Sequence, residues 1–407
     1  MRWFSFFNRR TPPRHVGVVY RPHRDAYGRD MRVAVVSESF LPTVNGVTTS
    51  VLRLLDHLAA EGHEAMVVAP AAGAPRSYAG FPVHEVPALA YRQFPVGLPN
   101  SQISGLLAQF RPDVLHVASP FLLGAQAIAA AKRLGVPSVA IYQTDVSGYA
   151  RRNRLAAASA FAWRLVRWIH EGADLTLAPS SSAMADLQAA GVPRLERWGR
   201  GVDIERYHPR HRLSMESREL RERLAPNGET LIGYIGRVAP EKSLERLAEL
   251  RGLPGMRLVI VGDGPAMPAV RRALDGMPVS YLGSLGGAEL ATAYSVLDVF
   301  LHTGTEETFG QTLQEAHASG LPVVAPRSGG PIDLVETGAD GILYDPAVEG
   351  DLRTAVALLL ASAETRSRMG EAGRRRVLGR SWNAICGELL EHYGRVITAR
   401  ALADARA

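Results

Sequence analysis

The feature that most constrains the fold is an alternation of short apolar runs and amphipathic helical segments along the first half of the chain. Five apolar runs predict buried strands, at residues 32–37, 63–70, 113–117, 137–142 and 174–179. Three segments with apolar residues at helical spacing lie between them, at residues 47–60, 123–134 and 155–170. Buried strands that alternate with helices indicate a parallel sheet covered on both faces.

The same alternation starts again after a polar, proline-containing segment at residues 201–230. Further strands are predicted at residues 231–236, 257–262, 279–283, 298–302 and 322–326, and a helix is predicted at residues 241–250. We therefore expect an α/β protein with two doubly wound, Rossmann-like domains that face each other across a cleft. Strand ends and helix N-termini meet at such a cleft, so it is the expected ligand site.

This pattern also predicts the domain limits. Residues 31–200 and 201–380 are expected to form the two domains. The chain from Asp351 onward has a helical pattern, and its last part, residues 381–407, is expected to be a helix that packs back on the first domain.

The first thirty residues differ from the rest of the chain. They contain seven arginines and two aspartates, a net charge of +5 out of +6 for the whole chain. Their apolar stretch is too short for a signal peptide. Residues 1–30 are either an unstructured basic extension, which we favour, or a weak membrane-interface anchor.

The single cysteine, Cys386, excludes an intrachain disulfide and a cysteine metal site, which favours a reducing cytoplasm. It lies in a helical pattern, Ser-Trp-Asn-Ala-Ile-Cys, so we expect a buried apolar residue rather than a nucleophile.

The first motif follows the first predicted strand. Asn45 and Gly46 are residue types that suit a turn with positive φ, and the helix that follows offers its N-terminus to an anion such as phosphate. The alternative is an ordinary strand-to-helix turn.

The second motif, Gly236-Arg-Val-Ala-Pro-Glu-Lys242, also follows a strand and begins a helix. Arg237 and Lys242 can converge on a diphosphate, one as a planar fork and one as a point charge. The alternative is a solvated helix start with a surface ion pair between Glu241 and Lys242. We favour the binding site.

The third motif is the carboxylate pair Glu307 and Glu315. Glu307 is predicted to lie in a loop before a helix that begins at Phe309, and Gly310 lets the backbone pack tightly. Glu315 lies about two helical turns later, so both carboxylates can face one groove. Carboxylates accept hydrogen bonds from sugar hydroxyls. A charged surface helix has the same spacing.

No Asp-X-Asp sequence occurs in the chain. Because such pairs often hold a divalent metal against a diphosphate, we expect no metal and no cofactor. Arg237 and Lys242 would then neutralise the leaving group instead.

Together these motifs resemble the retaining glycosyltransferase family four, which has the two-Rossmann B-type fold. The resemblance extends from Met31 to about Ile397. The segments at residues 38–48, 143–149 and 197–203 are similar to the GDP-mannose-dependent α-mannosyltransferases of actinobacteria. Those enzymes mannosylate phosphatidylinositol-type or glycolipid acceptors. A sulfoquinovosyl-diacylglycerol synthase shares part of the first motif.

The resemblance implies a role for each motif. Asn45 and Gly46 would contact the donor phosphate, Arg237 and Lys242 the diphosphate, Glu307 the donor sugar and Glu315 the ribose. The base pocket would lie along Leu282, Gly283 and Leu285, with Phe309 and Gly310 nearby. The reaction would be a front-face substitution with retention.

One part of the family pattern is absent. Ala118 and Gln143 stand where many members carry histidines, so no catalytic histidine can be transferred. Asp145 is the nearest polar candidate, and a turn or helix cap explains it equally well. His116 lies inside a predicted strand and is expected to be a core residue.

The helical segment 155–170 carries Trp163, Arg164, Arg167 and Trp168. These residues either dock the protein on the inner membrane leaflet or pack the tryptophans inward. The expected partners are therefore a nucleotide sugar and a lipid-linked or inositol acceptor, at a cytoplasmic or peripheral membrane location.

Two other functions are compatible with parts of the sequence. The same fold could use UDP-glucose or UDP-sulfoquinovose with a diacylglycerol-type acceptor. A nucleic-acid-binding module would explain the basic charge, but that charge is concentrated in the first thirty residues and no recognition motif accompanies it. We therefore expect no nucleic-acid partner.

Overall fold

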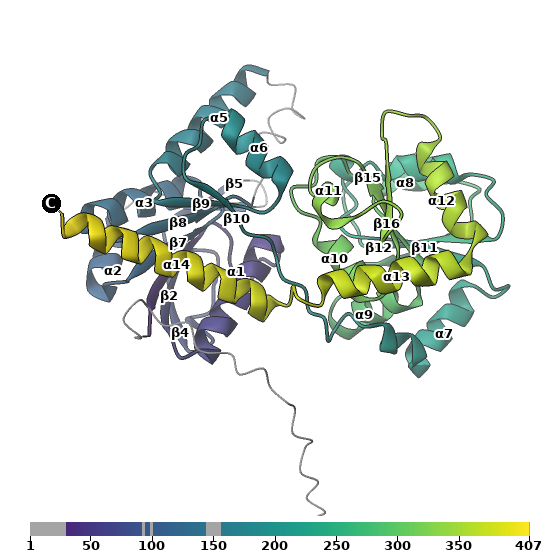
Figure 1. Ribbon diagram of the computed structural model, residues 1–407, viewed down its shortest axis with the longest axis horizontal. Coiled ribbons are helices and arrows are strands. Elements are labelled where there is room, and N and C mark those ends of the chain that lie inside the picture. The colour runs from purple at the N-terminus through teal and green to yellow at the C-terminus, as the bar shows by residue number, and fades with distance from the viewer. Residues whose placement is uncertain (1–29, 92–93, 98–100, 144–155, 407) are drawn as a thin grey trace, which may run out of the picture.

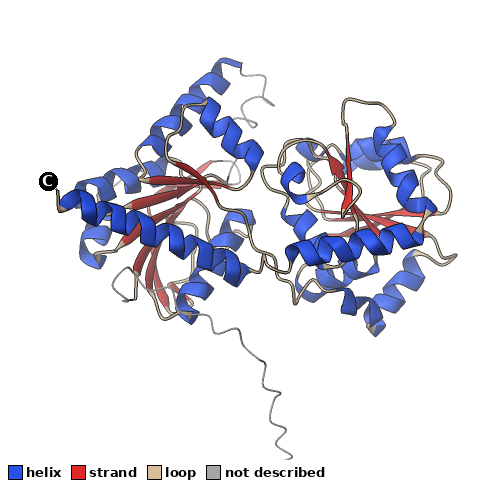
Figure 2. Ribbon diagram, in the orientation of Figure 1, coloured by secondary structure: helices blue, strands red, loops and turns tan. Residues whose placement is uncertain are grey.

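The computed structural model describes residues 30–91, 94–97, 101–143 and 156–406. It contains two α/β halves, each with a central sheet between layers of helices (Figures 1 and 2). The expected pair of doubly wound units is confirmed. Apart from Asp30, the predicted basic extension lies outside the described residues, as does Asp145.

The sheet of the first half has the strand order β10-β9-β8-β7-β1-β2-β4-β3, and every pairing is parallel except β3 with β4. Its strands are β1 (Arg32–Ser37), β2 (Glu64–Pro70), β3 (Ser77–Tyr78), β4 (Phe81–Val86), β7 (Val114–Ala118), β8 (Ser138–Ile141), β9 (Leu175–Ala178) and β10 (Leu195–Arg197). Its helices are α1 (Gly46–Ala60), α2 (Gln102–Phe110), α3 (Leu122–Leu134), α5 (Ala156–Glu171) and α6 (Ser181–Ala189). Strands β5 (Ala88–Tyr91) and β6 (Phe94–Gly97) form a separate antiparallel pair.

The second sheet is entirely parallel, in the order β13-β12-β11-β14-β15-β16. Its strands are β11 (Thr230–Ile235), β12 (Met256–Val261), β13 (Val279–Gly283), β14 (Val299–Leu301), β15 (Val323–Pro326) and β16 (Gly341–Tyr344). Its helices are α8 (Met267–Ala273), α9 (Gly287–Val296), α10 (Gln311–Ala318), α11 (Pro331–Leu334), α12 (Asp351–Ala361) and α13 (Ala363–Val377). Sequence order reverses at β11 and β14, and in the first sheet at β1 and β7. Ligands bind at such switch points.

The helix predicted at residues 241–250 is instead a pair of 3₁₀ turns, η2 (Pro240–Lys242) and η3 (Leu244–Leu250). Ser243 separates them with a positive φ of 49°. The buried residues of η3 are Leu244, Leu247 and Leu250. Their spacing of three matches the three residues per turn of a 3₁₀ helix, which explains why this segment does not form an α-helix.

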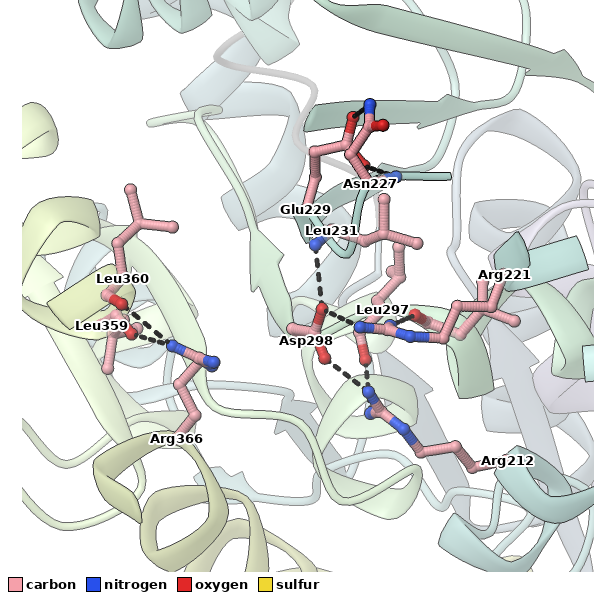
Figure 3. A network of polar contacts seen from close by, with 11 residues as sticks. Arg212, Arg221, Asn227, Glu229, Leu231, Leu297, Asp298, Leu359, Leu360 and Arg366 are labelled. Atoms are coloured by element: carbon pink, nitrogen blue, oxygen red, sulfur yellow. Dashed lines mark hydrogen bonds and ion pairs between the residues drawn. The ribbon is translucent and has the colours of Figure 1, made fainter. Parts of the chain in front are cut away.

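The polar segment 201–230 joins the halves, but it also contains helices η1 (Pro209–Leu213) and α7 (Met215–Leu224). The side chain of Asp298 links both helices to the second sheet through hydrogen bonds (Figure 3). Its carboxylate accepts hydrogen bonds from Arg212 Nη2 at 2.5 Å, Arg221 Nη2 at 2.9 Å and the Leu231 amide at 2.9 Å. Burial works against ionisation, but these three donors lower the pKa of Asp298. Charged contacts thus add to the apolar attachment of α7, whose Leu224 is buried in the core of the second half.

The last helix, α14 (Trp382–Asp404), leaves the second half and lies across the first (Figure 1), as predicted. Its residues Ile385, Leu389 and Tyr393 are buried in the core of the first half. Trp198 Nε1 donates a hydrogen bond of 2.8 Å to the Ile385 carbonyl. None of the described helices is long and apolar enough to cross a bilayer.

Asp298→Ala is expected to lower the free energy of unfolding by about 2–4 kcal/mol, because it leaves two arginines and a buried amide without their acceptor. Chemical denaturation of the purified variant measures this. The matched control is Asp404→Ala, which removes an exposed carboxylate paired with Arg400 and is expected to change stability by less than about 0.5 kcal/mol. Equal stability of the two variants would contradict the assigned role.

Candidate active site

The predicted site residues of the first half lie at the N-terminus of α1. Asn45 is the N-cap of this helix: its Oδ1 accepts hydrogen bonds of 3.0 Å from the amides of Val47 and Thr48. Its Nδ2 donates to Ser39 Oγ at 2.8 Å, which fixes the loop after β1. Asn45 therefore caps the start of the helix. Because its side chain already accepts from those two amides, they are not free to bind an anion.

The expectation of a positive-φ turn at these residues is wrong. Asn45 has a φ of −149°, and Gly46 is not among the positive-φ glycines. Gly46 is required for a different reason. A Cβ at this position would lie 2.5 Å from Nη1 of Arg200. Glycine leaves room for that guanidinium at the first residue of the helix.

Two polar residues for which the sequence predicts no role, Glu38 and Arg200, also form hydrogen bonds in this region. Glu38, just after β1, accepts hydrogen bonds from the amides of Phe121 (2.8 Å) and Gly124 (2.9 Å) at the start of α3. Burial raises the pKa of Glu38 despite these bonds. Arg200 donates to Gln143 Oε1 at 3.3 Å, so one of the positions without the family histidine contacts this arginine. Arg200 lies in the segment 197–203, which carries part of the family resemblance, but that segment does not indicate which residues Arg200 contacts.

In the second half, the central contact joins the ends of β11 and β14. Lys242 Nζ lies 2.5 Å from Glu307 Oε2, and both side chains are about four-fifths buried. Lys242 is further fixed by its carbonyl, which accepts a hydrogen bond of 2.6 Å from Thr303 Oγ1. The second and third motifs therefore meet at the switch point of this sheet.

Arg237 lies near this pair but is paired differently. Its guanidinium contacts Glu241, and its side chain is 64% exposed. The ion pair predicted as the alternative, between Glu241 and Lys242, is replaced by two other pairs, Arg237 with Glu241 and Lys242 with Glu307. Both cations thus form ion pairs with carboxylates of the second half.

Electrostatics in this region keep Glu307 ionised. Burial alone raises the pKa of Glu307, but Lys242 above all, together with His302 and Arg200, lowers it to about 2. His302 Nε2 lies 3.7 Å from Glu307 Oε2. Burial lowers the pKa of His302 to about 4 even though Glu307 opposes this shift, so the ring is neutral at pH 7.

Glu315 lies in a different environment on α10. Burial raises the pKa of Glu315 to about 7, although hydrogen bonds from Tyr294 and Gln311 oppose that shift. The Tyr294 hydroxyl donates at 2.9 Å. The two carboxylates therefore differ: Glu307 is fully charged at neutral pH, and Glu315 is partly protonated.

The residues of the predicted base pocket lie at the end of β13. Leu282 and Leu285 are partly buried against the core of the second half, and Gly283 has a φ of 69°. Gly310 caps α10 with a φ of 104°, a conformation that favours glycine. Phe309 is only 4% exposed and belongs to the core of the second half.

Two predictions about residues outside this site, on His116 and Cys386, can be compared with the structure. His116 is buried, contacts the Tyr393 hydroxyl at 2.7 Å, and has a pKa lowered to about 3 by burial, as expected for a core residue. Cys386 is buried, and burial raises its pKa to about 12, which leaves it unreactive. Within the described ranges, no group of three histidine, cysteine, aspartate or glutamate residues could hold a metal ion.

Comparison with known families agrees with this geometry. Residues 44–206 match the family described as Glycosyltransferase Family 4, and residues 216–376 match Glycosyl transferases group 1. The chain belongs to glycosyltransferase family four, which confirms the resemblance, and it is therefore an enzyme that transfers a sugar.

Individual relatives narrow the comparison. The chain is 48% identical over 381 residues to a GDP-mannose-dependent alpha-mannosyltransferase of Mycolicibacterium smegmatis, covering 91% of this chain and 99% of that one. It is 36% identical to a sulfoquinovosyl transferase of Arabidopsis thaliana, covering 88% and 72%. Anabaena HepE in complex with UDP has a similar fold, with a TM-score of 0.74, 19% identity, and coverage of 89% and 99%.

The raised pKa of Glu315 predicts a pH-dependent effect of Glu315→Gln on stability. Between about pH 4.5 and pH 7 the folded wild type keeps a proton that the unfolded chain loses, so wild-type stability falls as pH rises through this window. Glutamine does not titrate. We expect the variant to gain roughly 1–3 kcal/mol on the wild type between pH 4.5 and pH 8.

Urea denaturation of both proteins at pH 5, 6, 7 and 8 measures this gain. A difference that stays constant with pH, or that shrinks as pH rises, would contradict the assigned environment of Glu315.

Proposed function

We propose that this enzyme transfers mannose from GDP-mannose to a glycolipid or phosphatidylinositol-type acceptor, with retention of the anomeric configuration. The observation that carries this proposal is the Lys242–Glu307 pair at the switch point of the second sheet, in a chain that is 48% identical to a relative named as a GDP-mannose-dependent alpha-mannosyltransferase. Residues 201–380 would bind the donor, and residues 31–200 the acceptor.

The chemistry follows from the charges around this pair. The bond between the anomeric carbon and the diphosphate oxygen breaks, the acceptor oxygen bonds to the same face of the sugar, and the proton of the acceptor hydroxyl passes to the leaving diphosphate. Lys242 and Arg237 stabilise the charge that develops on the leaving diphosphate. Glu307, held ionised, accepts hydrogen bonds from sugar hydroxyls, while Glu315 accepts from the ribose.

We also propose that the reaction needs no divalent metal, because the cations Lys242 and Arg237 would neutralise the diphosphate instead. Transfer measured after dialysis against EDTA should equal transfer with added Mg²⁺. Activity that is lost with EDTA and restored by a metal ion would overturn this part of the proposal.

The alternative donors are UDP-glucose and UDP-sulfoquinovose, which the identity of 36% to a sulfoquinovosyl transferase keeps open. Hydrolysis of GDP-mannose, UDP-glucose and UDP-sulfoquinovose by the purified enzyme separates these possibilities. We expect release of GDP to exceed release of UDP.

Glu307→Gln is expected to lower transfer by at least about 100-fold, because it removes a charged acceptor at the reacting sugar. The variant also leaves the largely buried Lys242 without its ionised partner, so we expect a lower thermal stability, and transfer is compared at a temperature at which both proteins are folded. The matched control is Glu349→Gln, an exposed carboxylate of the same half, for which we expect unchanged activity. Full activity of Glu307→Gln would refute the assigned site.

A peripheral membrane contact at the cytoplasmic face is proposed from one face of α5. Phe161 and Trp168 are 67% and 65% exposed, and Arg164 and Arg167 are exposed beside them. Trp163 is partly buried against the first half, so one tryptophan packs inward and the other faces solvent. Exposed aromatic and arginine side chains on one helix suit an anionic bilayer.

The double variant Arg164→Ala/Arg167→Ala is expected to bind vesicles containing anionic lipid roughly 10-fold to 30-fold more weakly, because each arginine near such a surface contributes about 1 kcal/mol. Liposome co-sedimentation measures this. The control Arg218→Ala/Arg223→Ala removes the same charge from exposed positions of α7 and should bind as the wild type does. Unchanged binding of the α5 variant would refute the membrane contact.

A further inference from the structure

Arg200 lies in the segment that crosses from the first half to the second. Its carbonyl accepts a hydrogen bond of 2.9 Å from Gln314 Nε2, and the next carbonyl, of Gly201, accepts one of 3.0 Å from Gln311 Nε2. Both glutamines belong to α10, the helix that carries Glu315. The backbone at Arg200 is therefore fixed to the half that is proposed to bind the donor.

The Arg200 side chain reaches the other half. Its Nη1 lies 2.5 Å from the place where a Cβ of Gly46 would be, and its Nη2 donates to Gln143 Oε1 at 3.3 Å. Its Nε is buried and has no hydrogen-bond partner among the described residues. Within the part of the chain that the structure describes, no carboxylate lies within 4 Å of this guanidinium, and no acceptor is bonded to the Gly46 amide.

This is an unfavourable place for a cation without a counter-ion. The N-terminus of α1 carries a partial positive charge, so it repels the guanidinium. The nearby Glu307 is already paired with Lys242. Burial lowers the pKa of Arg200 to about 10, with Glu307 opposing the shift, so the side chain remains charged at pH 7. Positive charge from both halves thus converges on one location.

We propose that Arg200 binds the diphosphate of the nucleotide sugar, together with the Gly46 amide, as a third cation beside Lys242 and Arg237. This inference rests on the proposed function, because it assumes a nucleoside-diphosphate donor. The diphosphate would then contact the first half, the second half and the segment that joins them. It also accounts for Gly46, because any larger side chain would displace the guanidinium.

The test compares Arg200→Gln and Arg200→Lys with Arg197→Gln. Arg197 lies in the same segment, is half exposed, and contacts Asp333 at 3.5 Å. Binding of GDP and UDP is measured by isothermal titration calorimetry, and binding of guanosine and uridine by saturation-transfer NMR. We expect Arg200→Gln to bind the preferred nucleoside diphosphate about 10-fold to 100-fold more weakly, with nucleoside binding unchanged. The Arg197→Gln control should bind within about 2-fold of the wild type.

A double-mutant cycle adds a readout that a general loss of stability would not give. Gly46→Ala should weaken diphosphate binding because its methyl group displaces Arg200. The double variant Gly46→Ala/Arg200→Gln should then bind no more weakly than Arg200→Gln alone. Additive losses would show that the two residues act independently, which contradicts the proposal.

The outcomes separate this inference from the proposed function. Preference of the wild type for UDP would overturn the GDP-mannose donor, and the Arg200 comparison would then be made with UDP. Wild-type affinity in Arg200→Gln, or equal weakening of nucleoside and nucleoside diphosphate, would overturn the role of Arg200 whatever the donor. Arg200→Lys keeps the charge but lacks the planar fork, so we expect it to retain more affinity than Arg200→Gln. If Arg200→Gln fails to fold, Gly46→Ala decides: its methyl group displaces the guanidinium, so affinity equal to the wild type refutes the proposal.

Discussion

The ion pair between Lys242 and Glu307 is the interaction on which the account of the site depends. Its two residues come from loops after β11 and β14, which are adjacent only because the strand order of the second sheet reverses there. The pair costs desolvation, and the lowered pKa of Glu307 shows that the nearby cations outweigh that cost. A diphosphate that binds Lys242 would release Glu307 to accept hydrogen bonds from the sugar. This exchange of partners would therefore allow Lys242 to bind the diphosphate and Glu307 to bind the sugar of the same donor.

The two halves are joined so that this site can involve both of them. The segment leading to Val202 and the segment ending at Ser381 run side by side, and the Val202 amide donates to the Arg380 carbonyl at 2.9 Å. Gly201 permits this because a Cβ there would lie 2.5 Å from the Trp382 backbone. Beyond this crossing, α14 packs into the core of the first half. The C-terminal helix α14 thus stabilises the first half of the molecule.

Much of this architecture could be predicted from the sequence because buried parallel strands are short apolar runs, such as Arg32–Ser37 and Met256–Val261. The predictions from sequence were wrong where one residue type suits two different conformations. Asn45 suits both a positive-φ turn and a helix cap, and the structure uses the cap. The segment 241–250 is predicted to be a helix, and its leucines at a spacing of three give it the 3₁₀ form instead of the α form. Arg200 could not be placed because its contacts with Gly46 and Gln143 join residues far apart in the chain.

We propose that the donor diphosphate takes the place of Glu307 beside Lys242. A crystal structure of the enzyme with GDP-mannose, or with GDP and mannose, tests it most directly. The account predicts phosphate oxygens within hydrogen-bond distance of Lys242 Nζ and a Glu307 carboxylate that has moved from Lys242 to the sugar hydroxyls. A bound nucleotide whose phosphates lie elsewhere, with the Lys242–Glu307 distance still 2.5 Å, would contradict it.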